Sequence, residues 1–149
     1  MKVKTTIHIC AKDAAKLARA EKRLNIGRKE LISALVNHFA RRRKDQLKLW
    51  GRVRYQPPRD RSEWRRLHIT IRGDEYEFFI DVRKVHKLSV SFIVAYAINN
   101  YLDIIFTPGG NEGDNYPYYD YAIKKFETEG VVCCLLCWGI PHKLLKKTP

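Results

Sequence analysis

Two short segments of this chain carry hydrogen-bonding or cationic side chains at every second position, with apolar side chains between most of them. The side chains on the polar side are Lys4, Thr6 and His8 in the first segment, and Arg66, His68 and Thr70 in the second. These groups can bind a polar or anionic partner. No carboxylate or nucleophile is evidently arranged around the two histidines, so we expect binding and no enzyme activity.

The two segments belong to an internal repeat with an offset of 62 positions. Residues 5–9 align with residues 67–71, and the apolar positions that follow coincide without a gap. The aligned pairs are Leu17 with Phe79, Ile26 with Leu88, Ile32 with Val94, Val36 with Ile98, and Phe39 with Tyr101. Neither copy has enough residues to bury a core alone. We therefore expect the two copies to complete each other's core.

Each copy predicts one strand followed by two helices. Alternation of polar and apolar residues predicts strands at residues 3–10 and 65–71. Helical spacing of apolar residues predicts helices at residues 12–24, 28–42, 74–87 and 91–105. The last helix is apolar nearly all round, so we expect it to be deeply buried beneath the C-terminal segment.

The ends of these helices carry recognisable signals. Asn25 follows the first helix and suits the left-handed conformation that ends a helix. Lys87 stands at the equivalent position of the second copy and suits that conformation less well. Ser89 is placed to cap the last helix.

The composition divides the chain into four parts: a first repeat (residues 1–43), a basic linker (44–64), a second repeat (65–106) and a C-terminal appendix (107–149). Residues 41–65 hold ten Lys or Arg against three acidic residues, which indicates a solvated or disordered stretch. Arginines in such a place could also touch flanking phosphates or the minor groove. In the appendix we expect a helix from residue 116 to Glu129 and then an apolar run over residues 131–140.

The charge of the chain points to an anionic partner. Among its 149 residues, 29 Lys or Arg stand against 16 Asp or Glu, a formal net charge of +13. Nucleic acid is the first candidate and an anionic membrane surface the second. No apolar run reaches the roughly 18 residues of a membrane-spanning helix, and the N-terminus has no apolar stretch typical of a signal peptide. We expect a cytoplasmic, nucleoid-associated protein without a membrane partner.

Three of the four cysteines crowd together near the C-terminus. The spacing of Cys134 and Cys137 fits a zinc site, with Cys133 and His142 nearby, but no second pair accompanies it. We expect reduced, apolar thiols packed on a buried helix or strand. We predict no metal site and no cofactor.

A strand followed by two helices, occurring twice, resembles the ribbon-helix-helix family of DNA-binding proteins, the group of the MetJ, Arc and CopG repressors. The resemblance covers roughly two thirds of the chain. It implies that the two strands pair into an antiparallel ribbon that enters the DNA major groove, while the four helices interlock. The expected fold class is therefore mainly α with a two-stranded antiparallel ribbon: tandem ribbon-helix-helix repeats forming an intramolecular pseudo-dimer, followed by the appendix.

The resemblance also implies which residues contact DNA. The six polar side chains of the strands would read bases: Arg66 and Lys4 can reach guanine acceptors, and threonine offers a hydroxyl and a methyl group. The N-terminus of the second helix in each copy would bind phosphate. The matching positions are Gly27, Arg28 and Lys29 in the first copy, and Ser89, Val90 and Ser91 in the second.

The function predicted from these features is sequence-specific binding of double-stranded DNA and transcriptional repression, with self-association of the protein on DNA. One alternative is an antitoxin or other partner-binding protein that uses residues 116–149, including Tyr118, Tyr119 and Trp138, and binds DNA only to regulate itself. Another is an accessory factor of conjugation or phage DNA processing, whose ribbon bends an origin.

Overall fold

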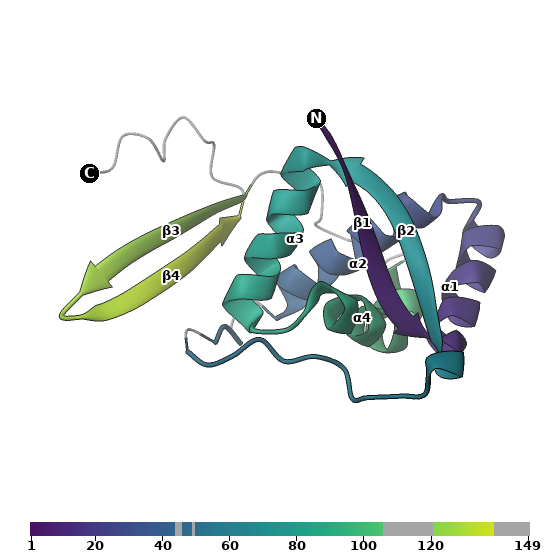
Figure 1. Cartoon of the computed structure of the whole chain (residues 1–149). Coiled ribbons are helices and arrows are strands. Elements are labelled where there is room, and N and C mark those ends of the chain that lie inside the picture. Colours follow the sequence, from purple (N-terminus) through teal and green to yellow (C-terminus); the bar gives the residue numbers. More distant parts are fainter. Residues whose placement is uncertain (44–45, 49, 106–120, 139–149) are drawn as a thin grey trace.

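The computed structural model of the chain describes residues 1–43, 46–48, 50–105 and 121–138. Its elements are β1 (Lys2–Cys10), α1 (Ala11–Leu24), α2 (Arg28–Arg42), the short 3-10 helix η1 (Arg61–Glu63), β2 (Trp64–Arg72), α3 (Gly73–His86), α4 (Val90–Ile105), β3 (Tyr121–Thr128) and β4 (Val131–Trp138). The described part is mixed α/β, with a β-α-α order that occurs twice and a further pair of strands (Figure 1). The predicted ends of the repeated strands and helices agree with the structure to within one residue.

β1 and β2 form a two-stranded antiparallel sheet, which we call the ribbon. Thr6 faces His68, the residue 62 positions later in the repeat. The pairing is therefore symmetric about these two residues, and each strand presents equivalent positions to the other. Antiparallel pairing of two equivalent strands about a shared centre is the arrangement expected of two copies related by a two-fold rotation.

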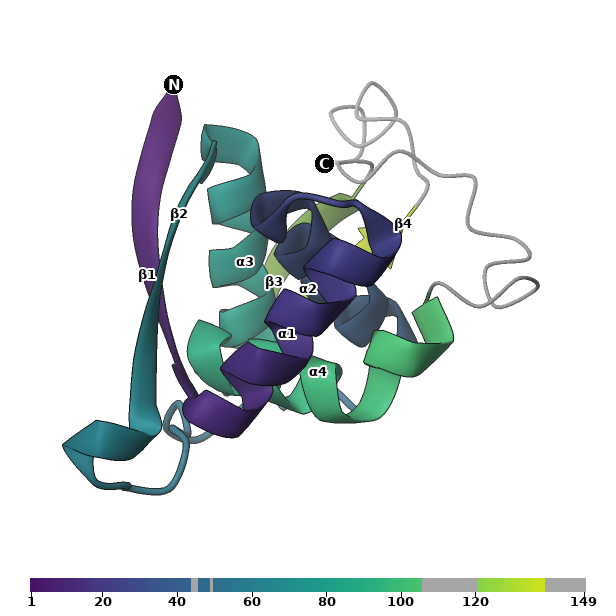
Figure 2. The same ribbon diagram turned by 90° about the vertical axis from the view of Figure 1, so that its right-hand side faces the viewer.

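The ribbon has one buried and one exposed face, as the alternation predicts. Ile7 and Ile69 lie in the same sheet and are 1% and 5% exposed, and Ile9, Leu67 and Ile71 are also buried. The four helices lie on this buried side, so the ribbon forms an outer layer (Figure 2). The other face, with Lys4 and Arg66, is exposed.

The two copies share one hydrophobic core. Phe39 of α2 is fully buried, and its ring lies 5.0 Å from His86 of α3 and 5.6 Å from Tyr96 of α4, measured between ring centroids. α4 is deeply buried, as its sequence predicts, but it is the first copy that buries it, through α2, α1 and β1. Each copy thus supplies the apolar surface that the other copy needs.

Buried carboxylates in the first turns of α1 and α3 also join the copies. Asp13 Oδ1 accepts a hydrogen bond from Asn99 Nδ2 of α4 at 3.0 Å. Glu75, which is equivalent to Asp13 in the repeat, accepts a bond from Ser33 Oγ of α2 at 3.4 Å. Each copy therefore donates a hydrogen bond to the buried carboxylate of the other copy. These bonds help to orient the helices of one copy relative to those of the other.

Both helix-ending positions adopt the left-handed conformation. Asn25 has φ 51° and Lys87 has φ 54°, so Lys87 adopts the conformation that we expect to suit it less well than Asn25. Next to this turn, the Arg54 N–H donates to the Lys87 carbonyl at 2.8 Å, which helps to hold the conformation in place. The cap is confirmed, because Ser89 Oγ accepts from the Phe92 N–H at 3.2 Å.

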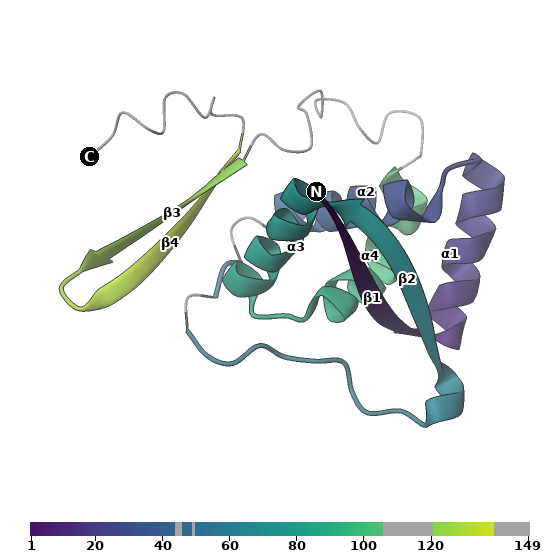
Figure 3. The ribbon, with the colours of Figure 1, turned by 45° about the horizontal axis from the view of Figure 1, so that its top comes forward.

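The C-terminal appendix differs from its prediction. Where a helix to Glu129 was expected, β3 pairs with β4 as an antiparallel hairpin. Glu129 and Gly130 join the strands with φ values of 53° and 74°, and two positive φ values in a two-residue loop suit a hairpin. The hairpin lies beyond α3, on the side away from α1 (Figure 3). The expected helix before residue 121 falls outside the described residues.

The described part of the basic linker is mostly exposed, as expected of a solvated stretch, but it is also bonded to the core. The Lys48 N–H donates to the Val85 carbonyl at 2.8 Å, and the Ser89 N–H donates to the Arg54 carbonyl at 2.9 Å. Gln56 Nε2 donates to the carbonyl of His8 on β1 at 2.8 Å. We call residues 50–63 the strap, because they run along the molecule from the end of α3 to the start of β2 (Figure 3).

A buried histidine makes the stability of this core depend on pH. Burial, reinforced by the nearby Arg43 charge, lowers the pKa of His86 from 6.5 to about 4. Between pH 6.5 and 4, His86 is protonated in the unfolded chain and neutral in the folded chain. The free energy of unfolding therefore falls as the pH drops from 6.5 toward 4. From this shift we expect a loss of about 3 kcal/mol between pH 7 and pH 4.

Denaturant unfolding at several pH values measures this loss against His86→Leu, which places in α3 the residue type that Leu24 provides in α1. The wild-type protein should lose about 3 kcal/mol more than the variant over that interval. Parallel pH profiles for the two proteins would show that His86 is not the titrating group.

Candidate nucleic-acid interface

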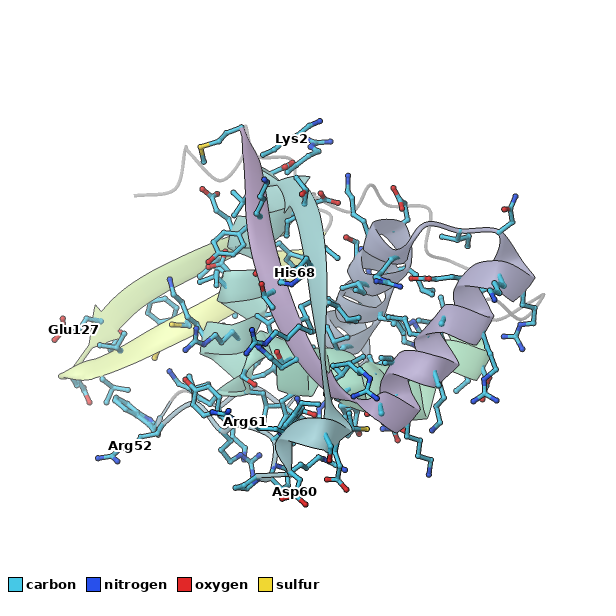
Figure 4. The ribbon with its side chains drawn as sticks, turned by 45° about the vertical axis from the view of Figure 1, so that its right-hand side comes forward. Lys2, Arg52, Asp60, Arg61, His68 and Glu127 are labelled. Carbon is cyan, nitrogen blue, oxygen red and sulfur yellow. The ribbon has the colours of Figure 1, made fainter. Side chains whose placement is uncertain are left out.

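The six predicted base-reading side chains lie on one face of the ribbon. All six are exposed, and they form three cross-strand pairs. These pairs are Lys4 with Thr70, Thr6 with His68, and His8 with Arg66. Figure 4 shows His68 near the middle of this outward face. The structure therefore brings together all the positions that the alternation placed on the polar side.

The central pair of this face is held by an internal hydrogen bond. Thr6 Oγ1 and His68 Nδ1 lie 3.0 Å apart and form one hydrogen bond, whose donor is set by the tautomer of the histidine. This bond fixes the imidazole ring and leaves its Nε2 for an external partner. Lys4, Arg66 and Thr70 make no side-chain hydrogen bond or ion pair with the described residues, so their polar ends are available.

The outward row extends one pair beyond the residues that we predicted. Lys2 faces Arg72 at the end of the ribbon, and both are exposed on the same face. Arg72 Nη2 also lies 2.7 Å from the carboxylate of Asp74. The sequence could have indicated this pair, because the alternation of polar and apolar residues continues to Lys2 in the first strand and to Arg72 in the second.

The first predicted phosphate site lies at the start of α2. Gly27 is the N-cap residue and makes no side-chain cap, and Arg28 and Lys29 follow it. Arg28 Nε lies 2.8 Å from Glu21, and Lys29 Nζ lies 4.0 Å from Glu75, so both cations have a carboxylate nearby. The carboxylate of Glu30 lies where a Cβ on Gly27 would be. A phosphate bound here must displace that exposed side chain.

The second predicted phosphate site, at the start of α4, is partly used by the protein itself. Ser89 is buried; its N–H donates to Arg54 and its Oγ accepts from Phe92. Ser91 Oγ accepts from the His8 N–H of β1 at 3.0 Å. The backbone N–H groups of Val90 and Ser91 are the parts of this site that bond to none of the described residues. An anion would therefore meet two cationic side chains at the first site and backbone N–H groups at the second.

Three of the four cysteine side chains lie within the part of the chain that the structure describes. Cys133 and Cys134 lie half-buried on β4 and, like the buried Cys10, are free thiols. In the described ranges, no group of three or more His, Cys, Asp or Glu side chains could hold a metal ion. The side chain of Cys137 and the whole of His142 lie outside those ranges.

None of the helices in the described part of the chain combines the length and the apolar character that crossing a membrane requires. Comparisons with protein-family models, with curated proteins and with solved structures find no significant match to this chain.

Proposed function

We propose that this chain is a tandem ribbon-helix-helix protein, an intramolecular pseudo-dimer that binds double-stranded DNA sequence-specifically and represses transcription. The ribbon would enter the major groove with its six polar side chains toward the base edges. The starts of α2 and α4 would meet the phosphates on either side. The proposed location is the cytoplasm, where the protein would associate with the nucleoid.

The observation that carries the proposal is the symmetric ribbon with two unlike faces. One face packs Ile7, Ile69 and their neighbours onto the helices, and the other presents hydrogen-bonding and cationic groups to solvent. A two-stranded ribbon has the width that the major groove admits. The net charge of +13 supplies the attraction to phosphate that such binding requires.

The hairpin favours a second candidate, a partner-binding protein of the antitoxin kind. Phe126 and Leu135, which share one face of the hairpin, are 50% and 49% exposed, and Val132 on the other face is 45% exposed, so both faces offer apolar surface to a partner. Tyr118 and Tyr119 and the side chain of Trp138, the predicted contacts, lie outside the described residues. Co-purification of a small protein that is lost on removal of residues 107–149 would favour this candidate.

The proposed function is tested by selecting bound sequences from random duplex DNA at a stated salt concentration. A selected motif with two unlike halves is expected, because Lys4, Thr6 and His8 differ from the equivalent Arg66, His68 and Thr70. Recovery of no enriched sequence would reject sequence-specific binding. Footprinting on the source genome would then separate a promoter site, expected of a repressor, from an origin site.

Two substitutions distinguish base reading from phosphate binding. Arg66→Gln should weaken binding to the selected site by about 1–3 kcal/mol and relax preference at one base pair, because it removes a bidentate contact. Lys29→Gln should weaken binding to all sequences alike. Fluorescence anisotropy with the selected duplex and its single-base variants measures both. Equal, sequence-independent losses for the two variants would reject Arg66 as a base reader.

A further inference from the structure

The two ends of the ribbon differ in charge, although their backbones are symmetric. Near the first end, α2 begins with Arg28 and Lys29. Near the second end, α4 begins with Val90 and Ser91 at the equivalent positions. The two helix starts therefore supply two cations beside one DNA backbone and none beside the other.

The outer row of the ribbon shows the same imbalance. Lys2 faces Arg72 at the first end, whereas Cys10 faces Trp64 at the second. On the outward face, Arg66 is the one cation toward the second end, whereas Lys2, Lys4 and Arg72 lie toward the first. Since each neutralised phosphate contributes to affinity, the second end would bind the DNA backbone less strongly than the first. Further cations for the second end can come from the segment that leads into β2.

The strap lies at this second end and is fastened to both layers. The Arg54 carbonyl accepts from the Ser89 N–H at 2.9 Å, and Gln56 Nε2 donates to the His8 carbonyl at 2.8 Å. At the start of β2, Trp64 Nε1 donates to the Arg59 carbonyl at 3.2 Å. Figure 4 shows Arg61 and Asp60 beside this end of the ribbon. The strap thus has a defined position next to the outward face.

A groove of about 740 Å³ separates the strap from β1 and α3. Arg61, Arg66 and Arg83 line it, and no carboxylate side chain is among its lining residues. Thr6 and His8 of the outward face and Val90 and Ser91 of α4 also line it. The groove therefore leads from the predicted base-reading surface to the free N–H groups of α4, and it is cationic along this path.

We propose that the strap is a third DNA-contacting element, which binds the sugar-phosphate backbone that flanks the ribbon at its second end. This inference rests on the proposed function. The side chains of Arg54 and Arg61, both exposed, supply there the charge that Arg28 and Lys29 supply at the first end. The complex is then balanced in charge although the repeat is not.

The test is the salt dependence of binding to a 24-base-pair duplex of random sequence. The double variant Arg54→Gln/Arg61→Gln should reduce the slope of log affinity against log salt by about 2, and each single variant by about 1. Arg54→Lys/Arg61→Lys keeps the charge and should restore the wild-type slope. On the selected site, hydroxyl-radical protection should shorten on one side only in the double glutamine variant.

The matched control is Arg19→Gln/Arg42→Gln, which removes the same charge elsewhere. Arg19 lies beside Leu102 and Asp103 toward the C-terminus of α4, and Arg42 is in the last turn of α2, so neither is near a helix start. Its slope should match the wild type. An unchanged slope in the folded strap variant, or an equal loss in the control, would overturn the role of the strap while leaving the proposed function intact. Failure of the wild-type protein to bind duplex DNA would reject the proposed function itself.

Discussion

Raising the salt concentration from 50 to 200 mM should weaken duplex binding by about a thousandfold or more. The expectation follows from six exposed or half-exposed cations along the ribbon and the start of α2: Lys2, Lys4, Arg28, Lys29, Arg66 and Arg72. Each phosphate that such a group neutralises releases counterions, and added salt opposes that release. Fluorescence anisotropy with a labelled duplex, in a series of potassium chloride concentrations, measures the effect.

The unfolding transition of the free protein, recorded at the same salt concentrations, serves as the control, because it separates weaker binding from loss of the fold. A binding constant that stays level across the series would count against phosphate contact by the ribbon. A steep slope with no sequence preference would leave phosphate binding in place and argue against base reading.

Phe39→Ala should lower the free energy of unfolding by about 3–5 kcal/mol. The ring is fully buried in α2 and packs on His86 and Tyr96, which belong to the second copy. Its removal leaves a cavity between the copies that neither can close alone. Because folded domains are stable by only about 5–15 kcal/mol, this loss should also reduce the fraction of protein competent to bind DNA. Denaturant unfolding followed by circular dichroism measures it.

Phe126→Ala provides a matched control on the hairpin, where the same side chain is 50% exposed. That variant should change the free energy of unfolding by no more than about 0.5 kcal/mol. If Phe39→Ala cost as little, or if the two copies unfolded in separate transitions, the shared core would not be the unit that folds.

The repeated part of the fold was readable from the sequence because its signals are local. The alternation around Ile7 and Ile69 has the period of a strand, and the apolar spacing from Leu31 to Phe39 has the period of a helix. Both patterns recur at the offset of 62 positions. Burial on one side of each element then follows from periodicity alone. The same signals placed the six outward side chains of the candidate site.

The errors have physical causes that composition does not report. The arginines of the strap are solvated, as predicted, but the defined position of the strap was not predicted, because it depends on backbone bonds such as that from Arg54 to Lys87, which any residue type could make. At the start of α4, the chemistry of Ser89 and Ser91 was recognised, yet their partners, Arg54 and His8, are distant in sequence. Prediction of site residues from one sequence therefore identified the groups and missed which of them are already engaged.

The hairpin was missed for a different reason. Residues 121–128 include Tyr121, Ile123, Phe126 and Thr128, which are residue types that favour strands, and Glu129-Gly130 is a two-residue loop that Gly suits. The prediction of a helix gave too little weight to this loop, whose two positive φ values reverse the direction of the chain. A turn signal between two β-prone runs should have prevailed over the expectation of a helix.

Because both strands of the ribbon come from a single polypeptide, its outward polar face forms without a bimolecular encounter. A ribbon built from two separate chains comes apart on dilution, and its affinity for DNA then includes the dissociation constant of the dimer. This chain has no such threshold. On a duplex that carries a single site, where self-association on DNA does not contribute, the proposed binding should follow a simple hyperbola down to the lowest protein concentrations.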